Sequence, residues 1–342
     1  MKKTSKNINR LSARFLAFAT ECRALQSPLY TRLSEAIACD VEILSLAAQA
    51  TSNPETNLLF AAVHYLLQKG YDHSLTNFYP SLCNNPRSGD PFPDFRAFCL
   101  AYNNKILNLI TTRRVQTNEV RRCVFLMPAF GMVYNLGQHQ PLAQIDIGTS
   151  AGLNLLWDQY EYDYGVGRRY GHPDAPVQIQ SELRGPTTPL ILDPLPPVNF
   201  RTGLDLHPVD VRDPDQADWL RALIWPEHHD RRQMLSAAIQ MFTNNPHTLC
   251  AGNALQTLPK AISEAPQNTT LCVFHSFALN QFSSDMREQL ESILLIHSES
   301  RPIYRISAEG NRLDLFTYTQ GECTSRQLAE VHAHGRWTNW LA

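Results

Sequence analysis

The feature that most constrains the fold is a change in hydrophobic periodicity near residue 140. Upstream, apolar residues recur at helical spacing, as in ETNLLFAAVHYLLQKG and FRAFCLAYNNKILNLI. Downstream, short apolar runs such as LAQIDIG, TLCVFHS and PIYRISAEG alternate with helical patterns. Strands that alternate with helices form a parallel, doubly wound sheet. The sequence therefore predicts an all-α domain over residues 1–138, followed by an α/β domain over residues 139–342.

Two segments of the second domain depart from this alternation. Residues 158–200 are rich in proline and glycine, which predicts an inserted lobe with short strands. Near the end, LDLFTYTQ and SRQLAEVH flank Gly321, which predicts an antiparallel hairpin at the edge of the sheet.

Composition excludes several classes of function. The chain has 342 residues and a formal net charge of -2, so it has no basic field that would attract nucleic acid. No apolar run approaches the roughly 20 residues that span a bilayer, and the N-terminus is typical of an amphipathic helix, not a signal peptide. The eight cysteines form no CxxC pair, which favours buried thiols in a reducing cytoplasm.

The histidines do not predict a metal site. PEHHD and HAHG contain neighbouring histidines but no further ligands at zinc spacing. We therefore expect a cytoplasmic protein with no bound metal, a small-molecule partner and no membrane or nucleic-acid partner. Its oligomeric state stays open.

The loop after the first predicted strand, residues 148–152, fits two chemical patterns. As G-x-S-x-G it is a nucleophile elbow that would expose Ser150 to attack a carbonyl. As a glycine-rich turn after a strand, it is a cradle for a nucleotide-like cofactor. A hydrolase elbow follows several strands, whereas predicted helices precede this loop. The order Ser150, Asp205, His332 nevertheless keeps a serine hydrolase as an alternative.

The ends of the next two predicted strands favour the cradle. Asp205 in TGLDLHP would accept hydrogen bonds from two ribose hydroxyls, and Asn253 in CAGNAL would contact an adenine edge. Asn154 follows the loop, where cofactor contact and helix capping are equally expected. The predicted cofactor-binding residues are Asp146, Gly148, Thr149, Ser150, Gly152, Asn154, Asp205 and Asn253.

Two later strand ends supply candidate catalytic groups. His275 in CVFHSFALNQF has the pKa class of a general base at neutral pH, although a histidine there is often only a wall residue. Glu309 in ISAEG is a candidate catalytic residue as a substrate-binding carboxylate, or else a surface charge.

The polar segment TTRRVQTNEVRR leads towards the first predicted strand. If it is helical, Gln116, Glu119 and Cys123 share one face, while Asn118 and Arg122 share another. We expect the segment to line the substrate site with Gln116, Asn118 and Glu119. The alternative is a solvated helix face with an ion pair, which charge runs usually indicate.

Several long blocks carry a family resemblance, among them RFLAFATECRALQSPLYTRL, DIGTSAGLNLLWDQYEYDYG, WLRALIWPEH and HAHGRW. Over nearly its whole length the chain resembles the DUF2332 family of uncharacterised bacterial proteins. Its second half also resembles the class I S-adenosylmethionine-dependent methyltransferase core, on Asp146, Gly148, Gly152 and Asp205.

The second resemblance implies a Rossmann-like core, S-adenosylmethionine as cofactor and methyl transfer to a small molecule. Two positions depart from its pattern: Ser150 replaces the middle glycine, and Asn253 replaces an acidic residue at the third strand. A nucleotide- or metabolite-binding protein without catalysis, built on the same fold, is therefore the alternative.

Overall fold

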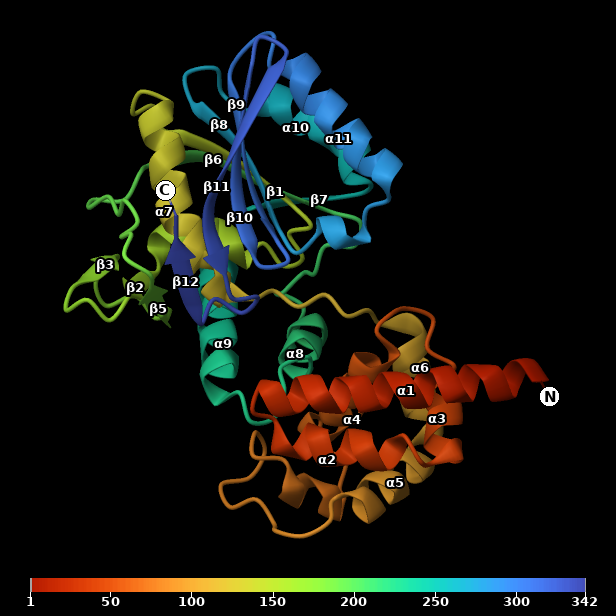
Figure 1. Cartoon of the computed structure of the whole chain (residues 1–342). Coiled ribbons are helices and arrows are strands. Elements are labelled where there is room, and N and C mark those ends of the chain that lie inside the picture. Colours follow the sequence, from red (N-terminus) through yellow and green to blue (C-terminus); the bar gives the residue numbers. More distant parts are fainter. Residues whose placement is uncertain (1, 342) are drawn as a thin grey trace. The chain divides into compact units, whose positions relative to one another are not determined.

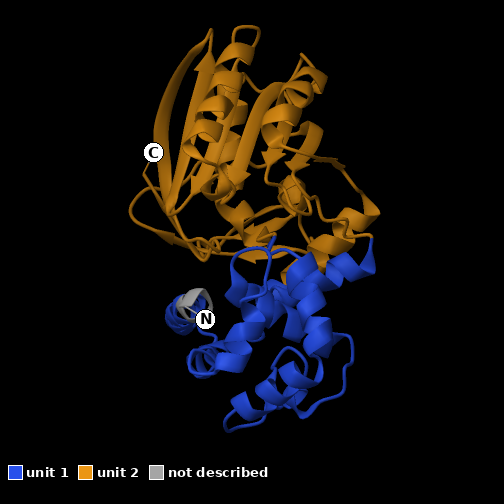
Figure 2. Ribbon diagram, turned by 90° about the vertical axis from the view of Figure 1, so that its right-hand side faces the viewer, with its two compact units in different colours: residues 1–117, 213–233 blue, residues 118–212, 234–342 orange. Residues whose placement is uncertain are grey.

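The computed structural model describes residues 2–341, with side chains from residue 7 onward. The chain divides into two compact units, which Figure 2 colours separately: residues 1–117 with 213–233, and residues 118–212 with 234–342. The observed division thus lies before helix α7 (Cys123–Leu136), whereas the sequence predicted a boundary after residue 138. Helical periodicity identifies a helix but does not say which core it joins.

Unit 1 is built of helices. This confirms the helices that the sequence predicted from apolar residues at helical spacing. Helix α4 is buried on nearly all sides. Phe60 of α4 stacks on Tyr30, with ring centroids 4.2 Å apart. His64 and Tyr65 of the same helix are also buried. The bounds are α1 (Lys2–Ala24), α2 (Pro28–Ile37), α3 (Val41–Ala47), α4 (Glu55–Gln68), η1 (Ser74–Phe78), α5 (Phe92–Ala101), α6 (Asn103–Thr112) and α8 (Pro214–Ala222).

Helix α8 belongs to unit 1 although it lies about a hundred residues further along the chain. The indole Nε1 of Trp219 donates to the carbonyl of Arg114 at 2.8 Å, and the hydroxyl of Tyr65 donates to Asp215. Helix α9 (His229–Asn244) then carries the chain from unit 1 into unit 2.

Unit 2 contains a nine-stranded sheet in the order β5-β12-β11-β10-β9-β8-β1-β6-β7 (Figure 1). The five strands from β9 to β7 are parallel, so the predicted mixed α/β fold with a mostly parallel sheet is confirmed. Strands β10 and β11 form the predicted antiparallel hairpin, but β12 and β5 extend the sheet beyond it. The bounds are β1 (Leu142–Ile147), β5 (Glu182–Arg184), β6 (Val198–Asp205), β7 (Thr248–Ala251), β8 (Thr270–Ser276), β9 (Ile303–Glu309), β10 (Arg312–Thr319), β11 (Glu322–Val331) and β12 (Trp337–Trp340).

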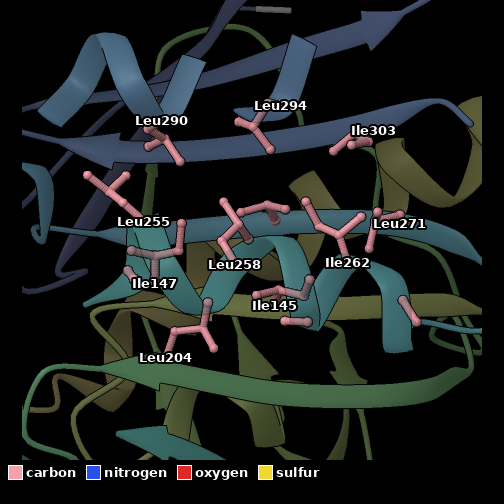
Figure 3. Packing of buried hydrophobic residues seen from close by; sticks show 14 of the residues in the cluster. Ile145, Ile147, Leu204, Leu255, Leu258, Ile262, Leu271, Leu290, Leu294 and Ile303 are labelled. Carbon is pink, nitrogen blue, oxygen red and sulfur yellow. The ribbon is translucent and has the colours of Figure 1, made fainter. Parts of the chain in front are cut away.

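Helices cover both faces of this sheet. On one face, α10 (Ala254–Glu264) and α11 (Ser284–His297) pack on alternate apolar residues of the central strands, as Figure 3 shows for Ile145, Leu258 and Leu290. On the other face, Phe130 of α7 contacts Phe274 of β8 and Trp157 of the 3₁₀ helix η3 (Leu153–Gln159). Because both faces are covered, every residue of β1 is buried.

The predicted inserted segment contains four short strands. Strands β2 (Glu161–Asp163), β3 (Arg169–Gly171) and β4 (Gln178–Gln180) form a separate small sheet, whereas β5 joins the large one. None of the helices formed by residues 2–341 is long and apolar enough to cross a membrane. All eight cysteines are free, and four of them are buried: Cys22, Cys99, Cys123 and Cys272.

Candidate functional site

The candidate site lies where the order of the parallel strands reverses. From β1 the chain continues to β6 and β7 on one side, and later to β8 and β9 on the other. In doubly wound sheets, ligands bind outside the carboxyl ends of the strands at such a reversal. We call this region, formed by the loops after β1, β6, β7 and β8, the carboxyl edge.

The loop after β1 has a backbone fixed from within the protein. Gly148, Ser150 and Gly152 have φ values of 74°, 53° and 74°. Five successive or nearly successive N–H groups donate to protein acceptors: those of Gly148 and Thr149 to the Leu204 carbonyl, Ser150 to Asp205 Oδ2, Gly152 to the Thr149 carbonyl and Leu153 to Asn118 Oδ1. A phosphate cradle needs N–H groups that point at the ligand. These five N–H groups already have partners.

The two glycines of the loop also pack against protein. A Cβ added at Gly148 would lie 2.5 Å from the Cβ of Ala278, in the loop after β8. One added at Gly152 would lie 2.8 Å from Leu249 of β7. Both distances are shorter than real Cβ contacts. Glycine is therefore required at these positions because other parts of the protein pack closely against them.

Asp205 joins the end of β6 to this loop. Its Oδ2 accepts the Ser150 N–H at 2.9 Å and its Oδ1 accepts the His207 N–H at 2.8 Å. Its carboxylate thus holds the backbone of two loops at the carboxyl edge. Asn253, after β7, caps α10 by accepting the Leu255 N–H at 3.0 Å, and its amide group retains its two donors.

Asp146, at the end of β1, is only 3 % exposed. Its Oδ2 accepts a hydrogen bond from Thr149 Oγ1 at 2.9 Å. Burial raises its pKa to about 8, and the nearby charge of Asp205 adds to the rise, while Thr149 and Arg122 oppose it. Asp146 is therefore mostly protonated near neutral pH. Asn154 is also buried, and its Oδ1 lies 3.6 Å from the thiol of Cys123.

The segment before α7 does not form a helix. Residues 113–119 are irregular, and only the 3₁₀ turn η2 (Val120–Arg122) follows. Asn118 Oδ1 accepts the Leu153 N–H at 3.0 Å, and Glu119 lies 2.9 Å from His334 Nδ1. These tertiary partners take the place of hydrogen bonds along a helix, so the proposed shared helix faces do not exist.

The three predicted substrate residues are divided between the two units. Asn118 and Glu119 belong to unit 2 and hold the loop after β1 and the C-terminal loop, respectively. Gln116 belongs to unit 1.

Sequence reasoning missed Arg122, which binds the end of β8 and the loop between β11 and β12. Its Nη1 donates to the Ser276 carbonyl at 3.0 Å, and its Nε donates to the Ala333 carbonyl at 2.9 Å. Its guanidinium lies 4.2 Å from the ring centroid of Phe277. In the sequence this arginine is part of a run of polar residues, and nothing distinguishes it from a solvated charge.

His275 and Glu309 form a separate pair. His275 follows Leu271 and Val273 at alternate positions of β8, so it lies on the α10–α11 face, where it is fully buried. Its Nδ1 lies 2.9 Å from Glu309 Oε1, which also accepts the N–H groups of Ala278 and Leu279 at 3.0 Å.

The charges of this pair are set by burial and hydrogen bonding. Burial lowers the pKa of His275, although Glu309 opposes this. Burial by itself would raise the pKa of Glu309, but His275 and the two backbone N–H groups lower it overall. An ionised Glu309 and a neutral His275 place the imidazole proton on Nδ1, and the buried Nε2 has no hydrogen-bond partner among the described residues.

The serine hydrolase alternative loses its structural basis. Within residues 2–341 no strand precedes β1, so the loop with Ser150 does not follow a fifth strand. His332 accepts the His334 N–H at 3.0 Å, and burial lowers its pKa to about 4. The part of the chain that the structure describes holds no group of three histidine, cysteine or acidic residues that could bind a metal.

Together these features define a mixed α/β protein with a helical unit and a large, mostly parallel sheet. Over residues 12–340 the sequence matches the model of a family described as an uncharacterised protein conserved in bacteria, DUF2332. The chain belongs to this family. No curated protein and no solved structure matches the chain.

Proposed function

We propose that unit 2 binds S-adenosylmethionine at the carboxyl edge and transfers its methyl group to a small molecule. The observation that carries this proposal is Asp205, which ends the strand beside β1 and touches the loop after β1. In doubly wound sheets an acidic residue at this place accepts the hydroxyls of a ribose. The strand order from β7 to β9 supports the same location.

The hydrogen bonds of the loop after β1 favour a nucleoside ligand without phosphates. The N–H groups that would hold a phosphate already bind Leu204, Asp205 and Asn118. S-adenosylmethionine carries no phosphate, so it does not need them. Asp205 would accept the ribose hydroxyls, and the free amide donors of Asn253 would pair with acceptor nitrogens of adenine.

The remaining chemistry requires alignment more than a base. The cofactor supplies an activated methyl group, and the protein holds the acceptor in line and excludes water. His275 is fully buried and bonded to the half-buried Glu309, so we assign neither of them a proton transfer. This burial also gives specific support to the second candidate, a metabolite-binding protein without turnover on the same fold.

Calorimetric titration tests the proposal with S-adenosylmethionine and S-adenosylhomocysteine as ligands. Asp205→Ala should weaken binding by about 2 kcal/mol or more, because the hydroxyls lose a charged acceptor. Asp205→Asn keeps an acceptor for the backbone N–H groups, so its affinity should lie between those of the parent and Asp205→Ala. The matched control is Asp285→Ala, which removes an exposed carboxylate in the first turn of α11 and should leave affinity unchanged.

Two results would reject the proposal. One is that neither ligand binds the folded parent protein while adenosine phosphates do, which would favour a nucleotide-binding role. The other is tight binding of S-adenosylmethionine that Asp205→Ala leaves unchanged, which would place the cofactor elsewhere.

A further inference from the structure

One stretch of the large sheet has an edge that no strand covers. Strand β11 pairs with β10 along its length, from Glu322 opposite Thr319 to Glu330 opposite Arg312. On its other side, β12 pairs only with residues 329–331 (Figure 1). Within residues 2–341, the outer side of residues 322–327 therefore has no strand neighbour; we call this stretch the open edge.

The open edge is exposed and carries two unmatched charges. Residues 322–326 are all exposed. Side chains alternate along a strand, so Glu322, Thr324 and Arg326 project on the same face. Neither Glu322 nor Arg326 forms an ion pair within the part of the chain that the structure describes. The two opposite charges stand at equal distances on either side of Thr324.

We propose that the open edge pairs with the open edge of a second copy of this chain, antiparallel, about a two-fold axis at Thr324. This register places Glu322 opposite the second copy's Arg326, and symmetry repeats the pair at the other end. Thr324 then faces its own counterpart, and β-branched residues and opposite charges are favourable cross-strand pairs. An interface in which the same patch serves both subunits is the usual form of a homodimer.

The charges also fix this register. Moving the axis by one residue places Glu322 opposite Thr324 or Leu328 and removes both ion pairs. Edge strands that avoid pairing commonly carry charges that repel a second copy. Here the two signs are arranged so that a second copy neutralises them, which favours self-association over binding of an unrelated strand.

Sedimentation of the full chain at about 1 to 200 µM tests the dimer, which should form within this range. Glu322→Arg and Arg326→Glu each place like charges opposite one another at two symmetric positions, and each should raise the dimer Kd by about tenfold or more. The double variant Glu322→Arg/Arg326→Glu restores complementary charges and should return the Kd towards that of the parent. Lys260→Glu reverses an exposed charge on α10 and should leave the Kd unchanged.

A disulfide tests the position of the axis. In a Cys323→Ser background, Thr324→Cys brings two thiols together across the axis, within the Cα separation that a disulfide allows. Oxidation should give a covalent dimer on a non-reducing gel. A parent chain that stays monomeric over the whole concentration range overturns the proposal. So does a dimer whose Kd neither charge reversal changes, because its interface lies on another surface.

Discussion

At the residue scale, Asp146 shows how burial changes the chemistry of a carboxyl group. The sequence marks it as an acidic residue in an apolar strand and predicts that it contacts a cofactor. In the structure it is almost fully buried, and Thr149 donates to it. Its pKa rises from its usual 3.8 to about 8 because the charged form loses its hydration.

This shift predicts a stability that falls as the pH rises. Between about pH 4 and pH 8 the unfolded chain releases the Asp146 proton while the folded protein keeps it, so ionisation favours unfolding. Asp146→Asn removes the titration and keeps a similar shape. From pH 4 to pH 8 the free energy of unfolding of the variant should gain about 2 kcal/mol or more relative to the parent. Urea unfolding at both pH values measures this, and parallel pH profiles would show that Asp146 ionises normally.

At the element scale, the loops after β1 and β8 are built against each other. Gly148 leaves room for Ala278, and the carboxylate of Glu309 holds the backbone of Ala278 and Leu279. Arg122 binds the end of the same β8 loop at Ser276. The loops of the carboxyl edge thus pack against one another, so a substitution in one loop should change the stability of its neighbour.

Gly148→Ala should destabilise unit 2 by about 2 kcal/mol. The added Cβ meets Ala278 at 2.5 Å, and a φ of 74° costs a non-glycine residue roughly 1 kcal/mol. Adding Ala278→Gly should restore the stability lost to the steric clash but not the stability lost to the positive φ of residue 148. Urea unfolding of the parent, both single variants and the double variant gives the coupling between the two sites. Strictly additive costs would mean that these loops do not touch.

Glu309→Ala should cost about 2 kcal/mol, because it leaves the N–H groups of Ala278 and Leu279 buried without an acceptor. Glu309→Gln retains an acceptor oxygen and should cost less. The lowered pKa of Glu309 means that its contribution is present above the usual glutamate pKa and is lost as the pH falls. The difference in unfolding free energy between the parent and Glu309→Ala should therefore shrink from pH 7 to pH 3. The matched control Glu288→Ala removes an exposed carboxylate and should change neither the stability nor its pH dependence. Equal stability of Glu309→Ala and the parent at pH 7 would contradict the anchoring role.

At the scale of the whole molecule, neither unit is a continuous piece of chain. Unit 1 takes residues 213–233 from between β6 and β7, and the indole of Trp219 in α8 is bonded to Arg114 there. Ala217 and Leu220 of the same helix are buried. A cut at residue 117 therefore separates α8 from the helices that cover it.

Residues 118–342 expressed alone should aggregate, because α8 then exposes its apolar face. Co-expression with residues 1–117 should restore a soluble complex of the two fragments. Solubility of each expression, followed by gel filtration, tests this. A soluble fragment 118–342 with a cooperative unfolding transition would show that unit 2 does not need residues 1–117.

The sequence by itself determined the helical first half, the five parallel strands of the second half and the final hairpin, because these follow from local periodicity. It also selected Asp205 and Ser150, which the structure joins by a hydrogen bond, since parallel strands bring their carboxyl ends to one edge. Only the tertiary structure decided that α7 packs on the sheet of unit 2, that the segment with Asn118 is not helical, and that Arg122 binds the end of β8. These outcomes depend on partners distant in the chain, and no local pattern encodes such partners.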